Sequence, residues 1–160
     1  MIPSDKCYAI IKHHESCVLK AYKDIGGVWT IGWGTVQYEN GAPVKAGQVL
    51  QQWKADELLN LEVQSKARSV QNLTSKVQLK QCQFDALVSF AYNVGVAALT
   101  SSTLLRRVLK SPFDPTIYDC FLMWNKAHIN GKLEEVPGLT ARRKSEAWLY
   151  ANDELKYYHE

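Results

Sequence analysis

The sequence predicts an α+β fold that is mostly helical, with a small antiparallel sheet near the N-terminus. Residues 48–94 contain neither glycine nor proline, and their apolar side chains recur at the three- and four-residue spacings typical of helices. Residues 15–35 differ, because side chains of different kinds alternate along the sequence and glycines are closely spaced, which indicates a hairpin there. At 160 residues the chain is long enough to bury about two-thirds of its unfolded surface, as one compact unit or two small lobes sharing a core.

A short helix is predicted first, over residues 4–14. Ser4 is a suitable N-cap, Asp5 lies in the first turn, and apolar residues form an inward face behind them. Glu15 follows directly and should therefore lie at the C-terminal end of this helix. There the negative end of the helix dipole disfavours a carboxylate and favours the protonated acid.

A hairpin follows, whose second strand reads V-W-T-I-G-W-G-T over residues 28–35. Because side chains alternate along a strand, Thr30 must share one face with the glycines while the two tryptophans share the other. A three-residue loop, 25–27, would place Asp24 opposite Val28 and diagonally next to Thr30, whereas a two-residue turn would put Asp24 on the other face. We therefore predict the odd-length loop.

Three functional groups of this region suggest a hydrolase. Eight residues separate Glu15 from Asp24, and five separate Asp24 from Thr30. Two carboxyls in unlike environments can break a glycosidic bond, since one delivers a proton to the leaving oxygen while the other activates water. A sugar ring is then a candidate for whatever lies close to the thin glycine face of the strand. Taken singly, the three residues are ordinary helix-end, turn and strand formers, so spacing alone is a weak signal.

The rest of the chain reads as helices joined by short turns. Residues 48–71 form a helix long enough to link two lobes, and residues 79–94 are apolar around more than half their circumference, as expected of a central core helix ended by Gly95. Further helices are predicted from a cap at 101–103 to Lys110 and over 116–127 and 141–152, with turns at Asn130-Gly131 and Pro137-Gly138.

The tryptophans and cysteines are predicted to be structural. Trp53, Trp124 and Trp148 fall on apolar helical stripes and should lie in the core, and Trp29 and Trp33 should pack beneath the sheet. The four cysteines have no metal-binding spacing, so free thiols are expected at Cys7, Cys17, Cys82 and Cys120.

Charge and hydropathy exclude several classes of function. The net charge of +3 is too small and too scattered to indicate nucleic-acid binding, although it would assist approach to an anionic bacterial surface. No run approaches the roughly 18 apolar residues of a membrane span, and residues 1–6 lack the plan of a signal peptide. Export would then depend on another component.

Several motifs, in order, resemble those of the phage-type lysozymes or endolysins. They are A-Y-K-D, G-V-W-T-I-G-W-G-T, Q-F-D-A-L-V-S-F-A-Y-N-V-G, S-S-T-L-L-R-R and G-L-T-A-R-R-K-S-E, and the resemblance covers residues 10–150. It implies that Glu15 is the general acid, Asp24 the second carboxylate and Thr30 the hydroxyl that helps to hold the attacking water. Some members carry a histidine where this chain has Thr35, so a role for that histidine does not carry over.

The resemblance also implies a lysozyme-like fold and a muramidase activity. The expected organisation is a single catalytic domain, 1–160, with an N-terminal lobe at about 15–50, the connecting helix, and a C-terminal helical lobe at about 72–160 on which helix 4–14 packs. The expected reaction is hydrolysis of the β-1,4 bond between N-acetylmuramic acid and N-acetylglucosamine in bacterial peptidoglycan, by a monomer without metal or organic cofactor. The protein would be made in the host cytoplasm and reach the wall through a membrane lesion made by a holin.

The last predicted helix begins with Arg142, Arg143 and Lys144, which have the wrong sign for a helix N-terminus. Each such charge costs a few tenths to about 1 kcal/mol unless a carboxylate compensates it. The resemblance suggests that Arg142 reaches Glu15 across the cleft. The alternative is a solvated basic turn, or one that contacts an anionic wall polymer.

Two rival functions stay open at this point. A lytic transglycosylase would cut the same bond with one acid and without Asp24, and a non-catalytic wall-binding or structural phage protein would lack a working acid. For hydrolysis, a carboxyl separation of roughly 6.5–9.5 Å predicts inversion at the anomeric carbon and about 5–5.5 Å predicts retention. We expect the longer separation, with Asp24 and Thr30 positioning the water.

Overall fold

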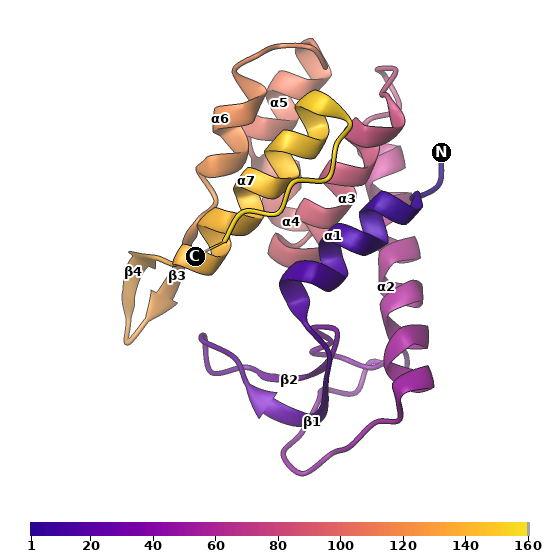
Figure 1. Ribbon diagram of the computed structural model, residues 1–160, viewed down its shortest axis with the longest axis vertical. Coiled ribbons are helices and arrows are strands. Elements are labelled where there is room, and N and C mark those ends of the chain that lie inside the picture. Colours follow the sequence, from indigo (N-terminus) through magenta and orange to yellow (C-terminus); the bar gives the residue numbers. More distant parts are fainter. Residues whose placement is uncertain (160) are drawn as a thin grey trace.

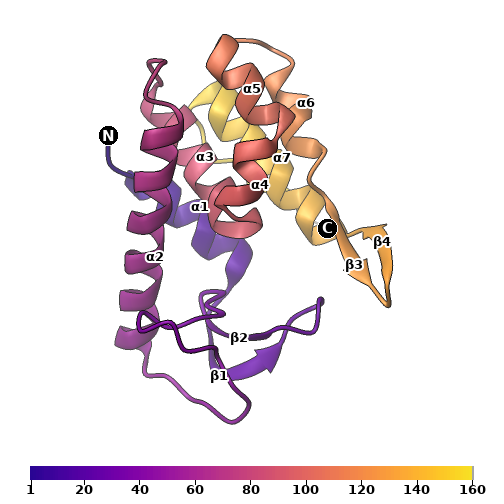
Figure 2. The ribbon, with the colours of Figure 1, turned by 180° about the vertical axis from the view of Figure 1, so that it is seen from behind.

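A helical bundle and a small sheet lie at opposite ends of the molecule, and one long helix runs beside both (Figures 1 and 2). The computed structural model describes residues 1–159. In chain order its elements are α1 (Asp5–Glu15), β1 (Val18–Lys23), β2 (Trp29–Gly32), α2 (Gln52–Leu73), α3 (Gln81–Val94), α4 (Val96–Ser101), α5 (Thr103–Lys110), α6 (Ile117–Leu122), β3 (Lys126–Ile129), β4 (Lys132–Glu135) and α7 (Pro137–Asn152). The predicted mostly helical α+β fold is confirmed.

Helix α3 is the centre of the main core, as its apolar sequence predicts. Every residue from Cys82 to Tyr92 is buried, and the helix packs against α1, α2 and α7. The Phe90 ring meets Phe121 and Trp124 edge-on, with centroids 5.7 and 5.8 Å apart. Gly95 ends the helix with a φ of 95°, a conformation that a side chain would disfavour.

The small sheet has the predicted odd-length loop. Tyr22 pairs with Thr30 and Lys23 with Trp29, and the Asp24 amide donates to the carbonyl of Val28 at 3.0 Å. The loop between the strands is therefore residues 25–27. A fully buried Ile31 joins a second, smaller core beneath this sheet.

The tryptophan predictions are only partly right. Trp124 packs against the main core, but Trp148 is only partly buried and its indole N–H donates to Glu154 at 3.0 Å. Trp53 is 63% exposed, so its prediction as a core residue is wrong. The buried Ala55 faces β2, and at 100° per residue Trp53 points about 200° away from it.

The segment after α6 also differs from prediction. The expected helix over 116–127 ends at Leu122, and β3 and β4 follow as a hairpin whose turn, Asn130-Gly131, has positive φ at both residues. Helix α7 begins at Pro137 rather than at 141, because proline is well suited to the first helical position. Pro137-Gly138 is therefore the start of a helix and not a turn.

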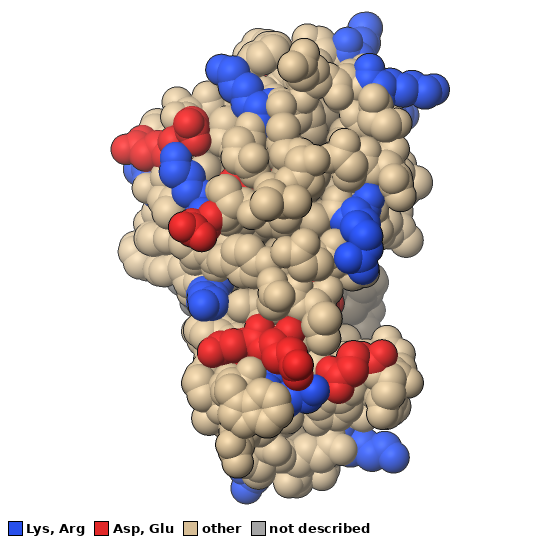
Figure 3. Space-filling model, turned by 90° about the vertical axis from the view of Figure 1, so that its right-hand side faces the viewer, with Lys and Arg blue, Asp and Glu red and all other residues tan. Residues whose placement is uncertain are grey.

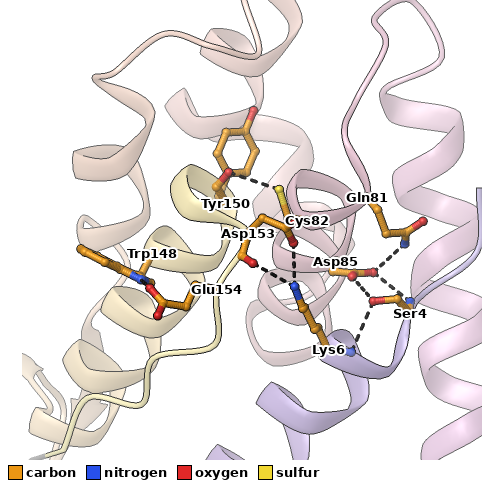
Figure 4. A network of polar contacts seen from close by, with 9 residues as sticks. All are labelled: Ser4, Lys6, Gln81, Cys82, Asp85, Trp148, Tyr150, Asp153 and Glu154. Carbon is orange, nitrogen blue, oxygen red and sulfur yellow. Dashed lines mark hydrogen bonds and ion pairs between the residues drawn. The ribbon is translucent and has the colours of Figure 1, made fainter.

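The N-terminal residues attach α1 to the bundle through a polar network (Figure 4). Both oxygens of the buried Asp85 accept from Ser4, one from its amide at 3.0 Å and the other from its hydroxyl. Lys6 pairs with Asp153 at 2.8 Å, just beyond the end of α7. These contacts hold the helix that carries Glu15 against α3 and α7.

Surface charges form ion pairs, and the cysteines carry free thiols. On the face that carries α2, acidic side chains gather around lysine (Figure 3), and Lys54 pairs there with Glu39 and Glu57 at 2.9 and 2.8 Å. All four cysteines are free, as predicted. Through residue 159, no helix combines the length and the apolarity needed to cross a bilayer.

Candidate active site

Glu15 is the last residue of α1, and its carboxyl is held from two sides. Arg142 donates from Nη1 to Oε1 at 2.5 Å, and only 15% of the Glu15 side chain is exposed. On the other side the backbone of Gly34 packs against the carboxyl so closely that a Cβ there would lie 1.8 Å from Oε2. A Cβ at Gly32 would likewise meet Ala55 at 3.3 Å. Protein atoms, rather than a sugar ring, therefore explain these glycines.

Asp24 is oriented by its own loop. Its Oδ1 accepts from the amides of Gly26 and Val28, at 2.9 and 2.8 Å. The buried Thr30 donates its hydroxyl hydrogen to the Val28 carbonyl at 2.9 Å, so the lone pairs of this oxygen can accept a further hydrogen bond. The hydrogen bonds that orient both groups therefore come from within the hairpin.

One cleft of about 390 Å³ collects all four residues singled out in the sequence. Glu15 enters it from α1, Asp24 and Thr30 from the hairpin, and Arg142 from α7. The cleft lies between the small sheet and the bundle, and its other lining residues include Tyr22, Glu62, Tyr92, Asn93, Val136 and Leu139. The contact between Glu15 and Arg142 joins residues 127 positions apart in the chain.

The basic segment of α7 is not a solvated turn. Because the helix begins at Pro137, Arg142 and Arg143 lie in its second turn, and they are 2% and 0% exposed. Two carboxylates compensate them, Glu15 from α1 and Glu146 one turn further along α7. The alternative of a free basic patch is therefore wrong for these two arginines.

Sequence reasoning missed two ionisable residues of the cleft. Burial raises the pKa of Glu62, nearby Glu15 acts in the same direction, and Lys66 opposes them. Burial lowers the pKa of His14 to about 3, assisted by the positive charge of Arg142, and its Nε2 is buried without a hydrogen-bond partner among the described residues. The available signal for Glu62 was a carboxylate directly beside the apolar stripe of α2.

Tyr92 belongs both to the main core and to the lining of the cleft. It is only 7% exposed. Its hydroxyl donates to the carbonyl of Trp33 at 2.7 Å, which ties α3 to the end of β2. Burial raises its pKa, with the charges of Glu62 and Glu15 acting in the same direction.

Comparison with known proteins identifies the family of this chain. Residues 12–146 match the family described as Phage lysozyme. The chain belongs to the phage lysozyme family. As a phage lysozyme it is a glycoside hydrolase, and the family indicated by its sequence motifs is confirmed.

Sequence relatives cover most of this phage lysozyme. An endolysin of Acyrthosiphon pisum secondary endosymbiont phage 1 is 35% identical and aligns with 92% of this chain and 96% of its own. The endolysin of Salmonella phage P22 is also 35% identical, over 88% and 91%. An endolysin of Bacillus phage B103 is 42% identical over 92% of this chain but only 53% of its own, so the present chain spans about half of that protein.

Solved structures with the same fold include an endolysin from Escherichia coli O157:H7 phage FAHEc1. It is 34% identical, has a TM-score of 0.88 and covers 98% of this chain and 97% of its own. The muramidase domain of SpmX from Asticaccaulis excentricus is 31% identical, with a TM-score of 0.78 over 92% and 95%.

Proposed function

We propose that this phage lysozyme hydrolyses the β-1,4 bond between N-acetylmuramic acid and N-acetylglucosamine in bacterial peptidoglycan. One observation carries the proposal: Glu15, paired with a buried Arg142, faces the same cleft as Asp24 and Thr30. Two carboxyls in one cleft, each held differently, are what a glycosidase without a cofactor requires. A solved relative with 31% identity is a muramidase domain.

In the proposed mechanism Glu15 is the general acid. It gives its proton to the glycosidic oxygen as the bond to the anomeric carbon breaks, and Arg142 holds the carboxyl in place before and after this step. A water molecule attacks the opposite side of the anomeric carbon, and Asp24 accepts its proton. Because the Thr30 hydroxyl hydrogen is directed at a carbonyl, its oxygen accepts from this water. The configuration of the anomeric carbon is inverted.

The same proposal includes how the protein is organised and where it acts. Residues 1–160 would form one catalytic domain, with a lobe at about 15–50, the connecting helix α2, and a lobe at about 72–160 that includes α1 by packing. The lysozyme would work as a monomer on the wall, after leaving the host cytoplasm through a holin lesion. Two relatives described as endolysins support the cell wall as the place of action.

Two measurements test the proposal: clearing of a bacterial suspension by variants, and analysis of the product that the wild-type protein releases. Glu15→Gln should abolish clearing of a bacterial suspension, and Asp24→Asn should reduce it at least 100-fold. Glu57→Gln, an exposed carboxylate outside the cleft, should leave it unchanged. An anhydromuramyl product would instead identify a lytic transglycosylase, and full clearing by Glu15→Gln would show that the catalytic acid is another residue.

A further inference from the structure

We infer that Glu146 is a positioning residue for catalysis, which acts on the acid Glu15 through Arg142. The inference rests on the proposed function of Glu15. Glu146 lies outside the cleft and touches no substrate, because its side chain is fully buried where α7 packs against α3. Its role is to fix the direction and the charge of the guanidinium that holds the acid.

The contacts of Glu146 come from three groups. Its Oε2 accepts from Arg142 Nε at 3.2 Å and from the Ser89 hydroxyl at 2.5 Å, and its Oε1 lies 2.7 Å from Arg143 Nε. All four side chains are at most 3% exposed. A carboxylate buried in this way is held in one orientation, since each of its oxygens already faces a donor or a cation.

The guanidinium of Arg142 has a different partner at each nitrogen. Nε donates to Glu146, Nη1 to Glu15, and Nη2 to the Ser89 carbonyl at 3.3 Å. The plane of a guanidinium is rigid, so fixing Nε sets the angle at which Nη1 meets the acid. Without Glu146 the group could turn about its remaining two contacts.

The charges lead to the same conclusion. Glu15 and Glu146 bring two carboxyl groups to the two buried guanidiniums of Arg142 and Arg143. Burial opposes the charge of Arg142, but the two carboxylates outweigh it and raise its pKa, whereas burial lowers the pKa of Arg143 to about 10. If Glu146 lost its charge, the Glu15 carboxyl would face two cations with no second carboxylate to balance them. The electrostatic field that Arg142 brings to the acid would then be more positive than in the wild type.

The pH profile of the reaction distinguishes positioning from mere stability. In Glu146→Gln the alkaline limb of the activity profile should move to lower pH by about 0.5–1 unit, with kcat reduced about 10-fold and KM little changed. Glu146→Asp, which keeps the charge, should restore most of the limb. Phe121→Leu, a change in the same core without any charge, should lower the melting temperature and leave the limb in place.

The outcomes separate this inference from the proposed function. If Glu15→Gln remains active, the proposed function is wrong regardless of Glu146. If Glu15→Gln is inactive while folded Glu146→Gln keeps both its limb and its kcat, the inference is overturned. Should Glu146→Gln fail to fold, Ser89→Ala decides, because it removes only one hydrogen bond to Glu146 and should still lower kcat 3- to 10-fold. A wild-type kcat in Ser89→Ala would overturn the inference.

Discussion

Replacing Gly34 with alanine should separate activity from stability in this lysozyme. Gly34 has a φ of 86°, and an added Cβ would lie 1.8 Å from Glu15 Oε2 and 2.7 Å from its Cδ. Real Cβ atoms stay beyond 3.0 Å, so the carboxyl oxygen must move by about 3.0 − 1.8 = 1.2 Å. That oxygen is the far end of a flexible side chain, and hence it can move without disturbing the backbone.

The magnitude follows from the two separate effects. An alanine at positive φ costs about 1–2 kcal/mol of stability wherever it occurs. A misplacement of about 1 Å in a catalytic group costs about 100-fold in rate, or roughly 2.7 kcal/mol of transition-state stabilisation. Gly34→Ala should therefore lose about 100-fold in kcat/KM while losing no more stability than alanine at any similar glycine.

Gly47 provides the matched control. Its φ is 82°, and a Cβ there would meet no atom within 4 Å. Clearing rates and melting temperatures of Gly34→Ala and Gly47→Ala should show similar stabilities and activities that differ about 100-fold. Equal activities in the two variants would refute the argument that the Gly34 backbone sets the position of the acid.

Three further predictions concern stability and its pH dependence. Because burial raises the pKa of Glu62, the stability that its protonated form contributes is lost as pH rises. Glu62→Gln should therefore melt at a higher temperature than wild type at pH 8 and at the same temperature at pH 3.5. A lower melting temperature at pH 8 would contradict this. His14, with a pKa of about 3 in the folded state and 6.5 in the unfolded state, makes the protein lose stability as pH falls between these values. Since His14 is partly exposed, His14→Gln should gain about 1 kcal/mol relative to wild type at pH 4.5 in urea titrations, and none at pH 8. Ser4→Ala removes a cap and a donor to the buried Asp85, so calorimetry should show a loss of about 1–2 kcal/mol, or roughly 2–8 °C; no change would mean that water replaces the hydroxyl.

The hairpin shows what local sequence can predict about this protein. Alternation along residues 28–35 and the requirement that Asp24 share a face with Thr30 were enough to specify a three-residue loop, and the register agrees. These are neighbouring residues, whose relative positions depend on backbone geometry alone. The N-cap of α5 is similar, since the Ser102 hydroxyl accepts from the Leu105 amide at 3.0 Å within one turn.

The burial of side chains and the pairing of residues far apart in the chain were harder to predict, because both depend on which helices and strands pack against each other. The periodicity of α2 placed Trp53 on an apolar stripe, but no neighbouring element reaches that side of the first turn. The strands β3 and β4 carry mostly polar side chains, and none of their residues is fully buried, so they lack the buried face that makes a strand visible in sequence. Glu62 and Glu146 were missed for the same reason, since a carboxylate on a helix reads as solvated until its neighbours are known.

The distance along the chain between Glu15 and Arg142 has a consequence for synthesis. A ribosome makes the acid within the first helix, but the arginine that holds it belongs to α7, the last helix of the described residues. In the proposed mechanism a nascent chain, or a fragment cut before α7, contains both groups of the hairpin and still lacks a competent acid. A lytic enzyme assembled in this way gains its activity only after α7 has been translated and has packed against α1.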